Sequence, residues 1–139
     1  MHQEENGRIP GHVAPDGVTV LSINFEDVKA GAFSVNAMRG SPGQNVFTHF
    51  YRYPGAYGIP FIQADPAGRI YMVLTWSARM ALVCLDGTNG NPVGMVELPL
   101  FYGQGGTQMR TFNVAPQGGL IYAEATESDM TYEWFNCHP

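Results

Sequence analysis

Three polar side chains occupy matching places in otherwise apolar segments of this 139-residue chain. His12, Gln63 and Asn113 each stand three residues before a proline. Imidazole and amide groups bind metal ions and polar ligands, so we predict that the three residues line a site for a polar ligand or a cation. The alternative is that they hold ordered water, since no carboxylate stands at the same place. No residue pattern points to a particular metal or cofactor, so the sequence assigns neither.

A second candidate site consists of aromatic and basic residues in two glycine-containing segments, 51–58 and 101–106. Tyrosine offers a large contact area with little side-chain entropy to lose, and arginine adds hydrogen-bond donors, so both are common at recognition surfaces. We predict a face that binds a ligand such as a sugar, or a protein, with packing between sheets as the alternative. The candidate residues are Tyr51, Arg52, Tyr53, Tyr57, Phe101 and Tyr102.

The chain lacks the common catalytic motifs. It has no G-x-S-x-G turn, no H-E-x-x-H pair and no phosphate-binding glycine loop. Carboxylates cluster at 26–27 and 124–129, where a pair could act as acid and base, but exposed loop acids that only solubilise a protein are the commoner case. The sequence therefore favours a non-enzymatic protein and leaves enzyme activity uncertain.

Composition argues against two classes of partner. The net charge is -5 and Lys29 is the only lysine, so no basic surface is available to neutralise phosphates, and we predict no nucleic-acid partner. The apolar runs are far shorter than the roughly 20 residues that a membrane-spanning helix needs, so we predict no membrane span. Low lysine with abundant glycine and tyrosine points to an extracellular or secreted protein.

The chain has two cysteines, Cys84 and Cys137, which are far apart in the sequence and form no C-x-x-C motif. Cys84 falls inside a predicted core strand, and Cys137 lies near the end of the equivalent strand of the next repeat. We therefore expect no disulfide bond between them. Two cysteines also offer too few ligands for a zinc site.

The chain contains a repeat of about 50 residues, a length typical of repeat architectures. Pro15, Pro66 and Pro116 each enter a turn that has glycine two positions later. Proline suits the second position of a tight turn, and glycine tolerates the positive φ that closes one. The predicted strands are 9–13, 18–25, 32–38, 45–50, 59–64, 70–76, 80–85, 93–100, 109–114, 120–125 and 131–135. The predicted units are a flexible arm at 1–8 and one domain of repeats at about 9–50, 59–100 and 109–139.

Four antiparallel strands per repeat describe one blade of a β-propeller. The segment Gly-Arg-Ile-Tyr at 68–71, followed by Ala-Leu-Val-Cys-Leu-Asp-Gly-Thr-Asn-Gly-Asn at 81–91, resembles the blade repeat of the quinoprotein-like (PQQ-like) and related propellers. Residues 119–123 resemble it in part. The resemblance implies a propeller in which the first strand of each blade lines a central channel, and this would bring the three polar residues together.

The third repeat has only three predicted strands, and three blades are fewer than the four that close a propeller. We therefore predict an all-β chain of blade-like repeats, a partial propeller that identical chains or another chain complete through open sheet edges. The alternative fold is a β-sandwich. The predicted function is a non-enzymatic binding or assembly module with a Tyr-rich loop face. The alternative function is part of a propeller enzyme, a lactonase-like hydrolase or a quinoprotein-like oxidoreductase with a polar central channel.

Overall fold

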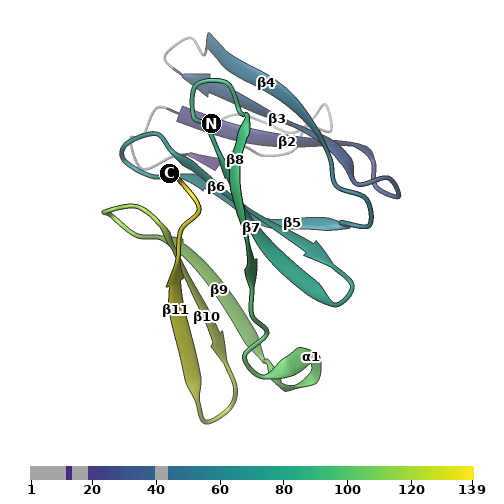
Figure 1. Cartoon of the computed structure of the whole chain (residues 1–139), viewed down its shortest axis with the longest axis vertical. Coiled ribbons are helices and arrows are strands. Elements are labelled where there is room, and N and C mark those ends of the chain that lie inside the picture. Colours follow the sequence, from purple (N-terminus) through teal and green to yellow (C-terminus); the bar gives the residue numbers. More distant parts are fainter. Residues whose placement is uncertain (1–11, 14–18, 40–43) are drawn as a thin grey trace.

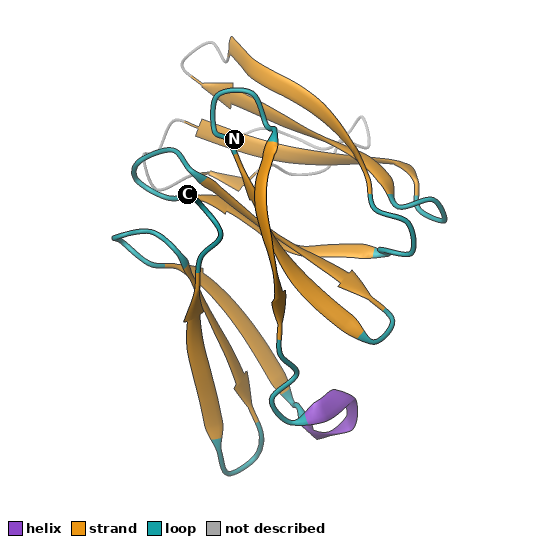
Figure 2. Cartoon of the chain, in the orientation of Figure 1, coloured by secondary structure: helices purple, strands orange, loops and turns teal. Residues whose placement is uncertain are grey.

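Apart from one helical turn, the regular secondary structure of the described residues consists of β-strands (Figures 1 and 2). The computed structural model describes residues 12–13, 19–39 and 44–139. Its elements are β1 (His12–Val13), β2 (Thr19–Asp27), β3 (Ala32–Arg39), β4 (Gln44–Arg52), β5 (Gly58–Ala64), β6 (Ile70–Trp76), β7 (Arg79–Leu85), β8 (Pro92–Leu98), the single helical turn α1 (Gly103–Gly106), β9 (Met109–Val114), β10 (Leu120–Ala125) and β11 (Met130–Phe135). Within these ranges, no helix has the length and apolar character needed to cross a membrane.

The strands form three antiparallel sheets that follow one another in the chain. Sheet A has the order β1-β2-β3-β4, sheet B the order β5-β6-β7-β8, and sheet C the order β9-β10-β11. The predicted all-β class and the predicted strands are confirmed where the structure describes them, with strand ends shifted by a few residues. Residues 9–11 and 18 of the first two predicted strands lie outside the described residues. The described residues thus form three sheets, where a plain sandwich has two. The predicted arm at 1–8 lies outside the described residues.

Tight turns join the first two strands of sheets B and C. The backbone N–H of Gly68 donates to the Asp65 carbonyl at 2.9 Å, and that of Gly118 donates to the Ala115 carbonyl at 2.9 Å. The φ angles of the two glycines are +89° and +102°, values that other residues rarely adopt. The predicted turn chemistry is confirmed in both repeats, and the corresponding turn of the first repeat lies outside the described residues.

The sheets stack face to face, A on B and B on C, so the middle sheet is buried on both faces. Residues Ile70–Leu74 of β6 and Met80–Leu85 of β7 are all buried. Because successive side chains of a strand point to opposite faces, these runs supply two separate apolar clusters. The cluster between A and B includes Leu21, Phe33, Ile70 and Met72, and the cluster between B and C includes Tyr71, Val73, Leu120 and Tyr122.

Beyond β11 the chain leaves sheet C and returns to sheet B. Cys137 forms a disulfide bond with Cys84 of β7, with 5.7 Å between the two Cα atoms. A Cβ at Gly94 of β8 would overlap the carbonyl oxygen of Cys137, so glycine lets this segment lie directly on the sheet. The prediction of unbonded cysteines was wrong, because it left Cys137 beside the last strand of its own repeat, whereas the segment after Phe135 lies on sheet B next to Cys84.

The disulfide should contribute strongly to stability, because it joins residues 53 positions apart and thereby restricts the unfolded chain. We expect Cys84→Ser/Cys137→Ser to lower the free energy of unfolding by about 2–4 kcal/mol. Urea unfolding of the double variant, beside wild type with and without reductant, measures the change. Non-reducing mass spectrometry that finds two free thiols in wild type would contradict the assignment.

Candidate functional site: the open face of sheet C

Sheets A and B each present one face to the sheet that follows in the chain. In sheet B, three cross-strand pairs define this face, and five of their six residues belong to the cluster shared with sheet C: Tyr71–Cys84, Val73–Leu82 and Thr75–Met80. The register of sheet C places three pairs at the same positions: Ile121–Trp134, Ala123–Tyr132 and Ala125–Met130. These six residues are exposed or half-buried, so this face of sheet C is open.

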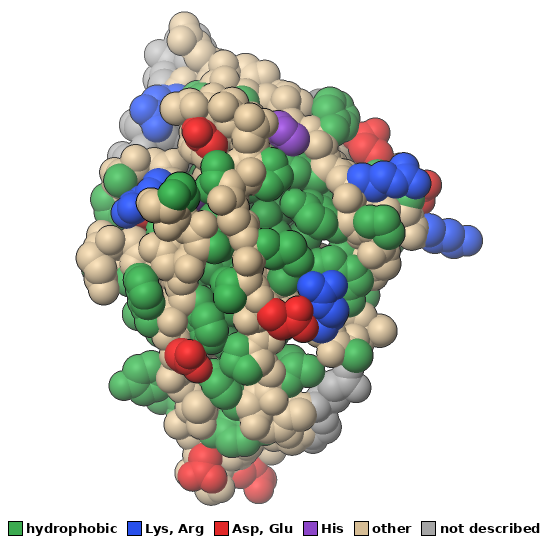
Figure 3. Space-filling model, in the orientation of Figure 1, with side chains coloured by type: hydrophobic (Ala, Val, Ile, Leu, Met, Phe, Trp, Pro, Cys, Tyr) green, Lys and Arg blue, Asp and Glu red, His purple; other side chains and the backbone are tan. Residues whose placement is uncertain are grey.

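The open face is apolar and carries no charge. With the alternate residues of β9 it comprises Met109, Thr111, Asn113, Ile121, Ala123, Ala125, Met130, Tyr132 and Trp134. Both methionines and both aromatic rings are between 51% and 68% exposed. In Figure 3, apolar side chains reach the surface over sheet C, and acidic side chains gather at the tip where the β10–β11 turn lies. Exposed apolar side chains gathered on one sheet face are typical of an interaction site.

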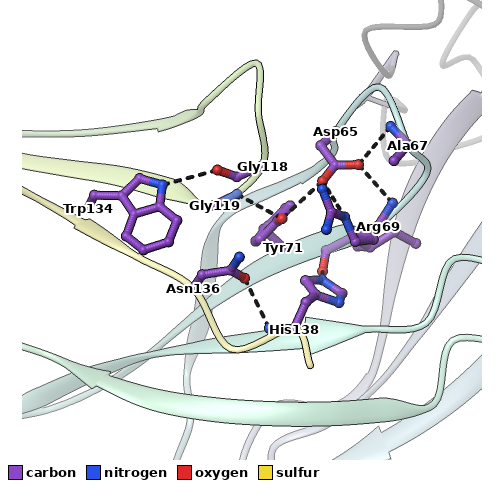
Figure 4. A network of polar contacts seen from close by, with 10 residues as sticks. Asp65, Ala67, Arg69, Tyr71, Gly118, Gly119, Trp134, Asn136 and His138 are labelled. Carbon is purple, nitrogen blue, oxygen red and sulfur yellow. Dashed lines mark hydrogen bonds and ion pairs between the residues drawn. The ribbon is translucent and has the colours of Figure 1, made fainter.

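Trp134 is held in a fixed position on this face. Its Nε1 donates to the carbonyl of Gly118 at 3.0 Å. A Cβ at Gly119 would overlap the indole, so the ring lies directly on the β9–β10 turn (Figure 4). Burying a tryptophan is costly when its N–H has no partner, and here that partner is already present. A binding partner could therefore cover the indole at little further cost in free energy.

A buried carboxylate, Asp65, links sheets B and C (Figure 4). Its Oδ1 accepts hydrogen bonds from the backbone N–H of Ala67 at 2.9 Å and of Arg69 at 3.0 Å. Its Oδ2 accepts from Arg69 Nε at 2.8 Å and from the Tyr71 hydroxyl at 3.0 Å. That hydroxyl accepts in turn from the N–H of Gly119 at 2.8 Å. The chain of bonds joins the β5–β6 turn to the β9–β10 turn on which Trp134 lies.

We expect Tyr71→Phe to lower the free energy of unfolding by about 1–3 kcal/mol, because it leaves the buried N–H of Gly119 and one lone pair of Asp65 without a partner. Chemical unfolding measures the change. Tyr57→Phe is the matched control, since Tyr57 is 58% exposed. Equal stability of Tyr71→Phe and wild type would show that the link contributes nothing.

A second buried carboxylate, Glu124, holds the segment between sheets B and C. It accepts hydrogen bonds from the backbone N–H of Phe101 at 3.2 Å and of Tyr102 at 3.3 Å. It also accepts from Thr107 Oγ1 at 2.5 Å and from the Tyr122 hydroxyl, and it forms an ion pair with Arg110 Nε at 3.4 Å. Burial raises the pKa of Glu124, but the hydrogen bonds from Thr107, Tyr122 and Tyr102 and the Arg110 charge outweigh burial and bring the pKa below its usual value. The carboxylate is therefore ionised, and both of its oxygens accept hydrogen bonds from the protein.

His138 packs on sheet B beside this link. Its Nε2 lies 3.0 Å from the carbonyl oxygen of Ile70, and its ring meets Tyr71 edge-on. Burial and the positive charge of Arg69 lower the pKa of His138, although the hydrogen bond to Ile70 opposes them. The imidazole is therefore neutral at pH 7 and donates its Nε2 proton to the carbonyl.

Acid should destabilise the fold in two steps. His138 has a lowered folded pKa, so its contribution is complete above the unfolded value of about 6.5 and is lost as the pH falls through the folded pKa. The contribution of Glu124 is complete above about 4.3 and is lost at lower pH in the same way. Urea unfolding between neutral and acid pH should show both steps. His138→Gln should remove only the first step, and an unchanged profile would contradict the assignment.

The predicted ring of polar residues is distributed over the first strands of the three sheets. Strand β5 lies beside both β1 and β9, so His12, Gln63 and Asn113 belong to neighbouring strands. The side chain of His12 lies outside what the structure describes. Gln63 alternates with residues that face sheet A, so it faces sheet C, and its Oε1 is buried without a hydrogen-bond partner among the described residues. Asn113 is exposed on the open face. A shared site of the three residues stays a prediction.

The predicted Tyr-rich residues are divided between the core and the surface. Tyr51 is 6% exposed, stacks on Phe33 and donates to the Gly90 carbonyl. Phe101 stacks on Tyr122. Tyr51 and Phe101 therefore pack inside the molecule, which is the alternative to the predicted recognition face.

The other four residues of this predicted face are more accessible. Tyr53 and Tyr102 are half-buried, and Tyr57 and Arg52 are exposed. Tyr57 lines a cavity of about 230 Å³ together with Trp76, Arg79, Leu100 and Arg110. The loop face therefore keeps one tyrosine and two arginines beside a hollow that can take a small polar ligand.

The acidic clusters do not form an acid–base pair. Glu124 is buried and engaged as above, whereas Glu26, Asp27, Glu127 and Asp129 are exposed. Among the described residues no group of three or more His, Cys, Asp or Glu side chains is arranged to hold a metal ion. The carboxylate chemistry considered from the sequence therefore has no geometric support in this part of the chain.

The open face was missed by sequence reasoning, although its signal is present in β11. Met130, Tyr132 and Trp134 alternate with Thr131, Glu133 and Phe135, so one side of the strand is uniformly apolar. Comparison with known proteins adds no assignment. No family model, curated protein or solved structure matches the chain.

Proposed function

We propose that this chain is a non-enzymatic binding and assembly module built from consecutive propeller-type blades. The supporting observation is a stacking step that occurs twice at the same register positions. Sheet B covers the pairs Leu21–Ala37, Ile23–Val35 and Phe25–Phe33 of sheet A, and sheet C covers the equivalent pairs of sheet B. The open face of sheet C is the surface on which a further sheet would stack in the same way.

The edge of sheet C supports the same function. In sheets A and B a fourth strand, β4 or β8, pairs with the third strand. Among the described residues β11 has no such neighbour, so its outer backbone groups are free to pair with another strand. An open edge beside an apolar face is the combination that recruits another β-structure.

Two further features fit an extracellular recognition protein. The disulfide between Cys84 and Cys137 suits an oxidising compartment. At the loop face, the Arg79 guanidinium lies 4.0 Å above the Trp76 ring beside the hollow that Tyr57 lines. Aromatic and guanidinium groups that share a hollow favour a small polar ligand or a peptide side chain as a second contact.

Association of the purified chain tests the function. Light scattering over a range of micromolar concentrations should give a mass that rises above 15.2 kDa. The Trp134 emission should move to shorter wavelength over the same range, with Trp134→Phe reporting the contribution of Trp76. A mass of 15.2 kDa at every concentration would contradict self-assembly. A stoichiometric metal or chromophore in the protein would instead favour the enzyme alternative.

A further inference from the structure

We infer that a second copy of this chain occupies the open face, packed about a twofold axis so that the two open faces meet each other. This inference rests on the proposed function and names its partner. It differs from closure of a ring by identical chains, in which the open face would meet the outer face of sheet A of the other copy. The chemistry of the two faces decides between these arrangements.

The centre of the outer face of sheet A is polar, with Ser22, Asn24, Asn36 and Thr48 across three neighbouring strands. The same face also carries Phe50 on the edge strand β4, which is 65% exposed, and Ser34, which is buried. Thr48 Oγ1 donates to Asn36 Oδ1 at 2.5 Å, and Asn24 Nδ2 donates to Glu26 at 3.2 Å. The open face could satisfy few of the remaining donors and acceptors. Packing the apolar side chains of the open face on these polar residues of sheet A would therefore remove water from polar groups without replacing their hydrogen bonds.

The open face is suited to a copy of itself. The chain has a net charge of -5, but none of the nine open-face residues is charged, so two copies can meet there without like charges facing each other. Tryptophan, tyrosine and methionine are the residue types enriched in interface cores. A hollow of about 450 Å³ can receive a side chain of the second copy, and its lining residues are Gln117, Ile121, Tyr132, Glu133 and Trp134.

The size of the face predicts a weak and reversible dimer. Three strands of six residues cover about 14 by 20 Å, and with side-chain relief each copy would bury about 500 Å². The total of about 1,000 Å² lies at the lower end of specific interfaces. A twofold contact uses the same patch on both copies and so ends at two. We expect a micromolar equilibrium that reaches a plateau at twice 15.2 kDa.

One pair of matched variants separates the two arrangements. Tyr132→Glu places a carboxylate on each open face and should raise the dimer Kd at least about tenfold. Asn24→Glu makes the same change of charge on the outer face of sheet A and should leave the Kd unchanged. Sedimentation equilibrium measures both Kd values, and urea unfolding checks that both variants are folded. Ring closure predicts weakening by Asn24→Glu as well.

Cross-linking tests the geometry directly. Ala123 lies at the centre of the open face, and facing sheets pack about 10 Å apart, so a short bis-maleimide should link two copies of Ala123→Cys. In a ring the two positions lie on separate blades and should not be linked. Ring closure predicts instead a link between Ala123→Cys in one copy and Ser22→Cys in the other, tested with an equimolar mixture of the two variants.

Each outcome decides a different claim. A dimer that Tyr132→Glu weakens, that Asn24→Glu does not change, and that links through position 123 supports the twofold contact. Association that survives Tyr132→Glu, or a mixed link between positions 22 and 123, overturns the twofold contact and leaves the assembly function standing. A wild-type chain that stays monomeric at all concentrations overturns both. Wild-type association is therefore the first measurement to make.

Discussion

Burial of both faces of sheet B is the constraint on which the rest of this structure depends. Sheets A and C each bury one face against sheet B. The two central strands of the middle sheet, β6 and β7, are apolar on both sides for this reason. Apolar burial supplies most of the driving force for folding, so loss of packing at sheet B would weaken all three sheets together.

Apolar packing has no direction, and polar links supply the alignment of sheet C on sheet B. Asp65 joins the turns of the two sheets through Tyr71, and Glu124 fixes the connecting segment at the opposite end of sheet C. The disulfide at Cys137 adds a covalent tie. Hydrogen bonds depend on distance and angle, so these links hold one orientation among the many that apolar contact would allow. They thereby fix where Trp134 lies and how the open face is shaped.

The stacking that stabilises the middle sheet also accounts for the candidate function. A repeat that buries one face on its predecessor exposes the other face unless a successor follows. At sheet C that exposed face is uncharged, contains a tryptophan with its N–H already bonded, and adjoins a strand edge. The catalytic arrangements considered from the sequence have no comparable support among the described residues, because the grouped carboxylates are either engaged in the core or exposed at the end of β2 and in the β10–β11 turn.

Local chemistry in the sequence was sufficient to predict the strands and the turns. Alternating apolar residues, proline at the second turn position and glycine at positive φ act over a few residues, so the meanders and the repeat could be read without a structure. The candidate site could be read only in part. Tyr57 is on the surface as predicted for the Tyr-rich face, but Tyr51, from the same segment, is in the core.

The pairing of Cys84 with Cys137, the burial of Glu124 and the exposure of Tyr132 and Trp134 were decided by tertiary structure alone. Each depends on which sheet face lies against which, and on the path that the chain takes after β11. Those contacts join residues far apart in the sequence, and no local pattern specifies them. The sequence determined which side of β11 is apolar, and the order of stacking determined that this side is the one left open.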